Sequence, residues 1–162
     1  MRLRLLKIIY HCYGGSHSSV IAAALHLKWI DKDRLPSEEE MMAIPYYDKT
    51  DNGDFGSIRF MGIDESGNEI YVLGKKGMGD KYTRILMGVA EIVGKADDLI
   101  AIDCLNRVNW SMKLGGFLSR RMGLIFPGRP VLVWGTRKAF LTLVNLVETV
   151  RLKSFSSSGV NK

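Results

Sequence analysis

The chain has 162 residues, of which 46% are hydrophobic and 25% charged, and its formal net charge is +6. This length and composition are typical of one globular domain with a sizeable core. The positive charge favours an anionic partner, and by itself it does not distinguish a phosphorylated metabolite from a nucleic acid or a membrane surface. No apolar run approaches the roughly 20 residues that a membrane-spanning helix needs, so the sequence argues against a membrane span.

The two cysteines, Cys12 and Cys104, are far apart and form no CxxC pair. This spacing argues against a disulfide framework and against a zinc ribbon. Reduced thiols fit a cytoplasmic location better, and we expect the protein there. The N-terminal sequence MRLRLLKIIYHCYGG indicates a first strand and not a signal peptide, because its apolar run is short and contains Lys7.

A strand, a glycine turn and a helix are predicted in the first 30 residues. The apolar segment LRLLKIIYHC, residues 3–12, is typical of a strand that is buried on both faces, and Gly14 and Gly15 follow it as a tight turn. Residues 16–30 predict a helix with Ser16 or Ser18 as its N-cap. Small alanines at 22–24 permit this helix to pack closely.

The middle of the chain predicts a short helix, a loop and a β-hairpin. Ser37 and Glu40 have the spacing of a capping box, and Pro45 should end the helix that they begin. The polar residues 46–56 predict a surface loop. Two strand-like runs, residues 57–64 and 68–74, flank the turn sequence ESG and predict the hairpin.

The rest of the chain alternates helices and strands. Helices are predicted at residues 80–96, 109–123 and 136–153, and strands at residues 98–104 and 130–135. The fold class is therefore α/β, a three-layer sandwich with a mainly parallel sheet, Rossmann-like or flavodoxin-like, plus a β-hairpin insertion. Residues 1–153 should form a single domain, and residues 154–162 a flexible C-terminal tail. The helical stripe Phe140, Leu143, Val144, Val147 and Val150 indicates core packing.

The loop of residues 12–19, CYGGSHSS, is the leading candidate for a binding site. Ligands of such sheets collect at the carboxyl ends of the strands, and a glycine turn that leads into a helix presents several N–H donors there. An anion-binding set follows, with Thr136 and Arg137 predicted at the same edge: Gly14, Gly15, Ser16, Ser18, Ser19, Thr136 and Arg137. The alternative is that the glycines only form the turn and one serine only caps the helix.

Cys12 adds a candidate nucleophile to this loop. A thiol near a helix N-terminus and a His17 cation can have a lowered pKa. The alternative is a small buried hydrophobe at the end of a strand. Strand alternation places His11 on the opposite face from Cys12, so His17 is the better partner.

Asp103 follows a predicted strand and is a third catalytic candidate. It could act as an acid or base or orient His17, whereas capping of the next helix is its structural alternative. Lys138 follows Thr136 and Arg137 at the start of the last predicted helix and could hold a second anionic group with them. Other polar residues near predicted helix ends favour capping or solvent exposure: Asn106, Arg107, Asn109, Arg120 and Arg121.

Metal, cofactor and nucleic-acid sites are not indicated. His11, Cys12, His17 and Cys104 are metal-binding residue types, yet they form no second short-spaced ligand pair. No motif of a known nucleic-acid module is present, so nucleic-acid binding is unlikely to be the function. We expect no cofactor.

The sequence CYGGSHSS resembles the phosphate loop of low-molecular-weight tyrosine phosphatases and arsenate reductases. Cys12, Gly14 and Ser19 match that pattern, whereas Ser18 stands where the pattern has Arg. The loop is also similar to the phosphocysteine loop of phosphotransferase-system enzyme IIB domains, which has no such Arg. These resemblances imply a binder or phosphoacceptor more than a phosphatase.

A longer resemblance covers most of the chain. The segments KIIYHCYGGSHSSVIAAALHL, IPYYDK, FMGIDESGNEIYVLG and GGFLSRRMG together resemble a domain-of-unknown-function family of Firmicutes. This resemblance implies a bacterial protein and brings no activity with it.

The functional hypothesis is therefore a protein that binds a phosphorylated or other anionic small ligand at residues 12–19. Cys12 would be a nucleophile in phosphoryl transfer or in thiol chemistry. The alternative is a non-enzymatic regulatory or protein-interaction domain in which this loop is structural.

Overall fold

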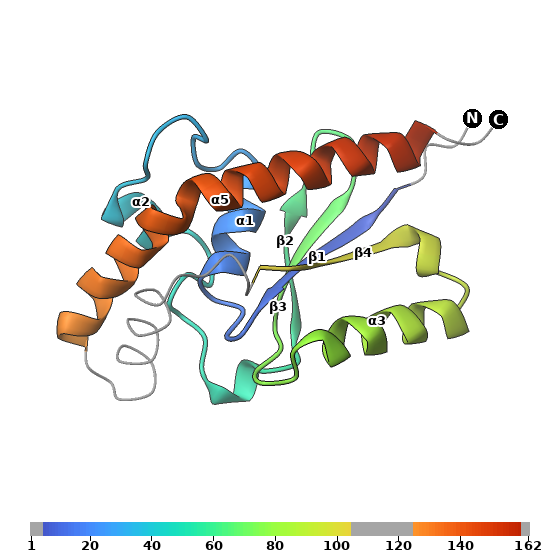
Figure 1. Ribbon diagram of the computed structural model, residues 1–162, viewed down its shortest axis with the longest axis horizontal. Coiled ribbons are helices and arrows are strands. Elements are labelled where there is room, and N and C mark those ends of the chain that lie inside the picture. Colours follow the sequence, from blue (N-terminus) through green and yellow to red (C-terminus); the bar gives the residue numbers. More distant parts are fainter. Residues whose placement is uncertain (1–4, 105–124, 160–162) are drawn as a thin grey trace.

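Four strands form one mixed sheet, in the order β2-β3-β1-β4, in the computed structural model, which describes residues 5–104 and 125–159 (Figure 1). The central strand β1 pairs in parallel with β3 and with β4, and β2 pairs antiparallel with β3. The predicted α/β class with a mainly parallel sheet is confirmed. The strands are β1 (Lys7–Cys12), β2 (Ile58–Ile63), β3 (Glu69–Gly74) and β4 (Leu99–Asp103).

Helices cover both faces of this sheet. On β1 the Tyr10 hydroxyl bonds the ring of His26 in α1, while the neighbouring His11 ring bonds Thr83 in α3. Because successive strand residues point to opposite faces, α1 and α3 lie on opposite sides. The helices are α1 (Ser18–His26), α2 (Glu38–Ala43), α3 (Asp80–Ile92) and α5 (Ile125–Gly159), with 3-10 turns η1 (Asn52–Asp54) and η2 (Ala96–Asp98).

The predicted hairpin is part of the main sheet. Its second strand, β3, lies beside β1, and its first strand, β2, forms one edge of the sheet. The Asn68 side chain in the turn accepts a hydrogen bond from the Leu6 N–H at 3.0 Å, which ties the turn to the start of β1. The hairpin thus supplies a parallel partner for β1, a position that the sequence left open.

The core lies between the sheet and α5, with α1 inside it. Every residue of α1 is buried, and the alanines at 22–24 are completely inaccessible. The predicted close packing of this helix is confirmed. Each fully buried aliphatic side chain here, such as Ile21, contributes about 1.5–3 kcal/mol to folding.

The strand predicted at residues 130–135 is wrong, because this segment lies inside α5. A short apolar run between Pro130 and Gly135 is compatible with a strand or with a buried helix, and its period does not decide between them. In the structure one face of α5 is buried at alternating spacings of three and four residues, which is the helical period. The buried face consists of Val133, Thr136, Ala139, Phe140, Leu143, Val147, Val150 and Ser154.

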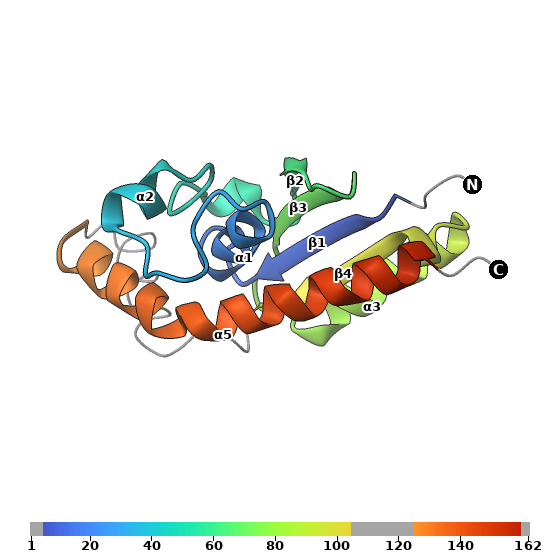
Figure 2. The same ribbon diagram turned by 90° about the horizontal axis from the view of Figure 1, so that it is seen from above.

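The helix α5 spans the length of the molecule beside α1 (Figure 2). The predicted core role of Phe140, Leu143, Val147 and Val150 is confirmed, and Val144 packs against the core while partly exposed. The helix continues to Gly159, into the stretch that the sequence assigned to a tail. The helix predicted at residues 109–123 lies outside the described residues. None of the described helices is long and apolar enough to cross a bilayer.

Candidate functional site

Cys12 lies at the end of β1, and hydrogen-bond donors of the following loop surround its sulfur. The Gly15 N–H donates to Sγ at 3.2 Å, and the Ser19 hydroxyl lies 3.1 Å from the same atom. Cys12 is 3% exposed, so this arrangement is closed to bulk solvent. The strand, glycine turn and helix therefore form a cradle around the thiol.

The cradle lowers the pKa of Cys12. Burial raises this pKa, but the hydroxyl and backbone N–H of Ser19 and the backbone N–H of His17 together outweigh burial and bring it below the ordinary value. The Ser18 hydroxyl lowers it further, although this buried oxygen makes no hydrogen bond of normal geometry to the described residues. The hydrogen bonds of the cradle therefore make the thiolate, which is the nucleophilic form, more accessible than in an ordinary thiol.

The prediction that a serine caps α1 is wrong. The N-cap is His17, and its side chain makes no capping hydrogen bond. The backbone N–H groups of His17 and Ser19 interact with the Cys12 sulfur. This sulfur, from the preceding strand, therefore takes the place of a capping side chain at the start of α1. The N-terminus of α1 and the thiol thereby form one unit.

The loop is pressed against the end of β3. Gly15 has a φ of +65°, and a Cβ built on it would lie 2.4 Å from the backbone nitrogen of Gly74. Conversely, a Cβ on Gly74 would lie 2.7 Å from the carbonyl oxygen of Gly14. Both positions therefore require glycine, and the predicted turn is confirmed with a packing reason that the sequence did not reveal.

The predicted surface loop is wrong in its first half, because residues 46–50 pack over the cradle. The Asp48 N–H donates to the Ser16 carbonyl at 3.0 Å, and the Thr50 hydroxyl donates to the Gly14 carbonyl at 3.3 Å. Tyr46 and Asp48 have positive φ angles of 65° and 50°. Such strained residues are held by their surroundings and cluster at functional sites. We call residues 46–50 the covering segment.

His17 connects the cradle to the covering segment. Its Nε2 lies 3.1 Å from Asp48 Oδ1, and its ring meets the Tyr47 ring edge-on at 5.9 Å between centroids. The Asp48 side chain is 1% exposed. His17 therefore contributes its backbone N–H to the thiol, while its ring is oriented by Asp48.

Two basic residues lie near the loop, and the sequence analysis did not name Arg59 as a site residue. Arg59 of β2 donates from Nη2 to the Gly15 carbonyl at 3.3 Å. Lys75 follows β3, and its backbone N–H donates to the Cys12 carbonyl at 3.0 Å. The alternation within β2 could have placed Arg59 on one face, but its nearness to the loop depends on the pairing of β2 with β3.

Asp103 lies on the other face of the sheet from Cys12. It pairs in register with His11, its Oδ2 is 2.5 Å from Lys75 Nζ, and its Oδ1 is 3.8 Å from His11 Nδ1. The Lys75 side chain is fully buried. The structure therefore joins Asp103 to Lys75 and His11, and the orientation of His17 falls to Asp48.

The pKa of His11 is lowered to about 4. Burial is the main cause and the positive charge of Lys75 adds to it, while Asp103 and Asp80 act in the opposite direction. The ring is therefore neutral near neutral pH. The sequence prediction that His11 points away from Cys12 is confirmed by its bond to Thr83.

Thr136 and Arg137 are not at a strand end, because both belong to α5. The Thr136 hydroxyl lies 2.8 Å from the hydroxyl of Tyr47 in the covering segment, and both are buried. Arg137 donates from Nε to the Pro36 carbonyl at 3.1 Å, and Lys138 lies over the Trp134 ring. Thr136 therefore stabilises the covering segment through its contact with Tyr47. Arg137 binds the segment that precedes α2.

Several candidates for capping and solvent exposure lie outside the described residues: Asn106, Arg107, Asn109, Arg120 and Arg121. Within residues 5–104 and 125–159, no group of three or more His, Cys, Asp or Glu side chains is arranged to hold a metal ion.

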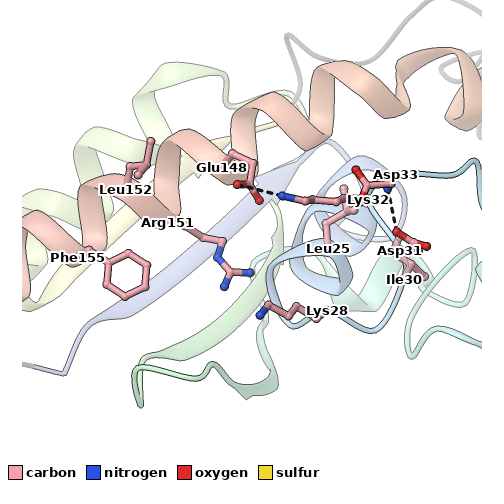
Figure 3. A pocket seen from close by; sticks show the side chains of 10 residues that line it. All are labelled: Leu25, Lys28, Ile30, Asp31, Lys32, Asp33, Glu148, Arg151, Leu152 and Phe155. Carbon is pink, nitrogen blue, oxygen red and sulfur yellow. Dashed lines mark hydrogen bonds and ion pairs between the residues drawn. The ribbon is translucent and has the colours of Figure 1, made fainter.

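A separate cavity of about 490 Å³ lies between the C-terminal end of α1, the segment after it and α5 (Figure 3). Its lining combines apolar side chains such as Phe155 with charged ones. The Lys28 and Arg151 cations at this cavity both contact the Glu65 carboxylate, at 2.6 and 3.1 Å. The Cys12 cradle is at the other end of α1, so the two are distinct.

Comparison with known proteins gives a family and no activity. No curated protein and no solved structure matches the chain. One family model matches residues 7–152, a range that contains the cradle, the covering segment and Arg59. The chain therefore belongs to the family described as "Protein of unknown function (DUF3189)".

Proposed function

We propose that the loop of residues 12–19 binds a phosphorylated or other anionic small ligand, and that Cys12 acts on it as a nucleophile in phosphoryl transfer. The observation that carries this proposal is the set of N–H and O–H donors around the Cys12 sulfur, which lowers the pKa of the thiol. A cradle that stabilises a thiolate also suits the oxygens of a phosphoryl group.

The surroundings support an anionic ligand. The cradle lies at the N-terminus of α1, and the chain carries a net charge of +6. The reduced thiol that this chemistry needs agrees with the cytoplasmic location and the bacterial origin that the sequence led us to expect.

The reaction would proceed through a phosphocysteine. The thiolate sulfur attacks phosphorus, an S–P bond forms, and the P–O bond to the leaving group breaks. The leaving oxygen takes the electron pair of that bond and a proton from a general acid, for which the His17 ring is the candidate in this loop. Asp48 orients this ring through its contact with Nε2.

A second candidate function follows from the burial of Cys12. Because the thiol is only 3% exposed, its hydrogen bonds could serve only to fix the turn. The protein would then be a non-enzymatic regulatory or protein-interaction domain. The two candidates differ in whether the thiolate forms and whether an anion reaches it.

The test is a titration of the Cys12 thiolate by its ultraviolet absorbance, in a Cys104→Ser background that leaves one thiol. We expect a thiol pKa below that of an ordinary cysteine, and a thermal stability that increases with inorganic phosphate. The Cys12→Ser variant is the control for the absorbance. An ordinary thiol pKa, together with no response to phosphate, would establish the structural candidate instead.

A further inference from the structure

We infer that Arg59 is the cation that binds the ligand's anionic group at the cradle, and that this group is a tetrahedral oxyanion of the phosphate type. This inference rests on the proposed function and names the charge that the proposed site requires. The loop of residues 12–19 itself contains no Lys or Arg. A cation must therefore come from another part of the fold.

The sheet places Arg59 on the same face as Cys12. Arg59 pairs with Val72 of β3, and Val72 pairs with Tyr10 of β1. Tyr10 and Cys12 are two residues apart on one strand, so their side chains share a face. The guanidinium reaches the loop itself, where Nη2 donates to the Gly15 carbonyl at 3.3 Å.

The donors of this guanidinium are incompletely used. Its side chain is 13% exposed, and its buried Nε makes no hydrogen bond to any residue that the structure describes. Its contact with Asp54, from Nη1 to Oδ2, is 3.7 Å and exceeds hydrogen-bond length. A buried guanidinium has five N–H donors, and leaving them unsatisfied is unfavourable.

The cradle contains a second buried donor. The Ser18 hydroxyl acts on the Cys12 sulfur, but its Oγ is fully buried and makes no hydrogen bond of normal geometry to the described residues. Ser18 begins α1, next to the N–H groups that act on Cys12. An oxyanion accepts several hydrogen bonds at once, so one ligand could satisfy donors from Ser18 and from Arg59.

The covering segment orients Arg59. The Tyr46 ring lies 4.7 Å from the guanidinium carbon, in a cation–π contact. A guanidinium can bind two oxygens of one anion through two of its N–H groups, and the Nε of Arg59 is a donor with no hydrogen-bond partner among the described residues. A planar fork of this kind distinguishes phosphate-type anions from halides, which offer a single atom.

The experiment compares Arg59→Met with Arg84→Met, using inorganic phosphate as the probe in the Cys104→Ser background. Arg84 is exposed on α3, so its substitution removes the same charge away from the cradle. Two quantities are measured: the phosphate dependence of the melting temperature, and the pKa of the Cys12 thiol with and without phosphate. In the parent and in Arg84→Met, bound phosphate should raise that pKa, because like charges oppose each other.

We expect Arg59→Met to weaken phosphate binding by about 10- to 100-fold, as loss of a charged hydrogen-bond partner does. If Arg59→Met binds phosphate as the parent does, the inference about Arg59 is overturned while the proposed function stands. If the parent shows no phosphate response in either quantity, the proposed function fails and the inference fails with it.

A second variant covers the case in which Arg59→Met does not fold. Arg59→Lys keeps the charge and loses the planar fork. We expect Arg59→Lys to bind phosphate several-fold more weakly than the parent. The Cys12 pKa should therefore rise only at higher phosphate concentrations than in the parent. Unchanged affinity in Arg59→Lys would show that the fork does not bind the anion and would overturn the inference.

Discussion

His11 and Cys12 are neighbours in the sequence, but their side chains lie in two different buried environments. Cys12 faces the α1 side, where uncharged N–H and O–H groups surround its sulfur. His11 faces the α3 side, where Lys75 and Asp103 form an ion pair beside it. One strand therefore presents a hydrogen-bonding cradle on one face and a charged cluster on the other.

The pKa is lowered at both residues, with opposite consequences for charge. For the thiol, a lower pKa favours the anion, because the cradle donates hydrogen bonds to it. For the imidazole, a lower pKa favours the neutral ring, mainly because burial opposes its cation. Burial alone therefore does not determine the charge of a group, because hydrogen bonds to the charged form can outweigh the effect of burial on its pKa.

The largest expected effect is on the Cys12 side, in Gly15→Ala. The positive φ and the 2.4 Å approach to the Gly74 nitrogen leave no room for a Cβ, so we expect a loss of about 3 kcal/mol or more in the free energy of unfolding. Urea denaturation measures this loss. Gly77→Ala is the control, because a Cβ at that position meets nothing within 4 Å. Similar losses in both variants would contradict the close packing of the loop.

On the His11 side, Lys75→Met should cost about 2–3 kcal/mol, because it leaves Asp103 without a buried cation. The double variant Lys75→Met/Asp103→Leu should recover part of this loss. The pKa of His11 should also rise in Lys75→Met, since the charge of Lys75 lowers it. Nuclear magnetic resonance titration of the His11 ring checks the second outcome, and an unchanged pKa would separate His11 from the ion pair.

The stability should decrease in mild acid because of His11. Its pKa is about 4 when folded and about 6.5 when unfolded, so between these values the unfolded chain binds more protons. The contribution of His11 is complete above about pH 6.5 and is lost as the pH falls towards about 4. We expect about 2 kcal/mol less stability at about pH 5 than at about pH 7.5.

The His11→Gln variant isolates this pH effect from that of His26, whose pKa burial also lowers. We expect a flatter dependence of the free energy of unfolding on pH in the variant than in the parent. Identical pH profiles for the two proteins would show that His11 is not the titrating group.

The smallest effect distinguishes the donors of the cradle. Ser19→Ala removes the hydroxyl that lies 3.1 Å from the sulfur and should raise the Cys12 pKa. Ser18→Ala should raise it less, because the contribution of the Ser18 hydroxyl is smaller. The thiolate absorbance in the Cys104→Ser background measures both shifts, and Ser66→Ala in the hairpin turn should show none.

The local parts of the fold were predictable from the sequence. Ser37 and Glu40 form the expected capping box, and Gly15 adopts the positive φ of the expected turn. The apolar segment at residues 130–135 was assigned to the wrong element, because a short apolar run fits both periods. Only the tertiary structure places this segment inside the long helix α5.

The sequence predicted which residues form the loop of the candidate site. It did not predict which residues from other parts of the chain surround that loop. The sequence placed Cys12, the glycines and the serines together because they are consecutive. It offered Asp103 as one candidate to orient His17, whereas in the structure Asp48 contacts the His17 ring, from a loop that we expected to lie on the surface. Polar composition predicts exposure on average, but Asp48 is buried where it bonds the cradle.

By itself, the sequence determined that a strand ends at Cys12, that a glycine turn and a helix follow, and that His11 and Cys12 point to opposite faces. These features depend on residues a few positions apart, whose geometry the backbone fixes locally. The tertiary structure alone decided which side chains complete each environment. Asp48 reaches His17 from 31 positions away and Arg59 reaches Gly15 from 44, because sheet pairing and loop packing bring them there.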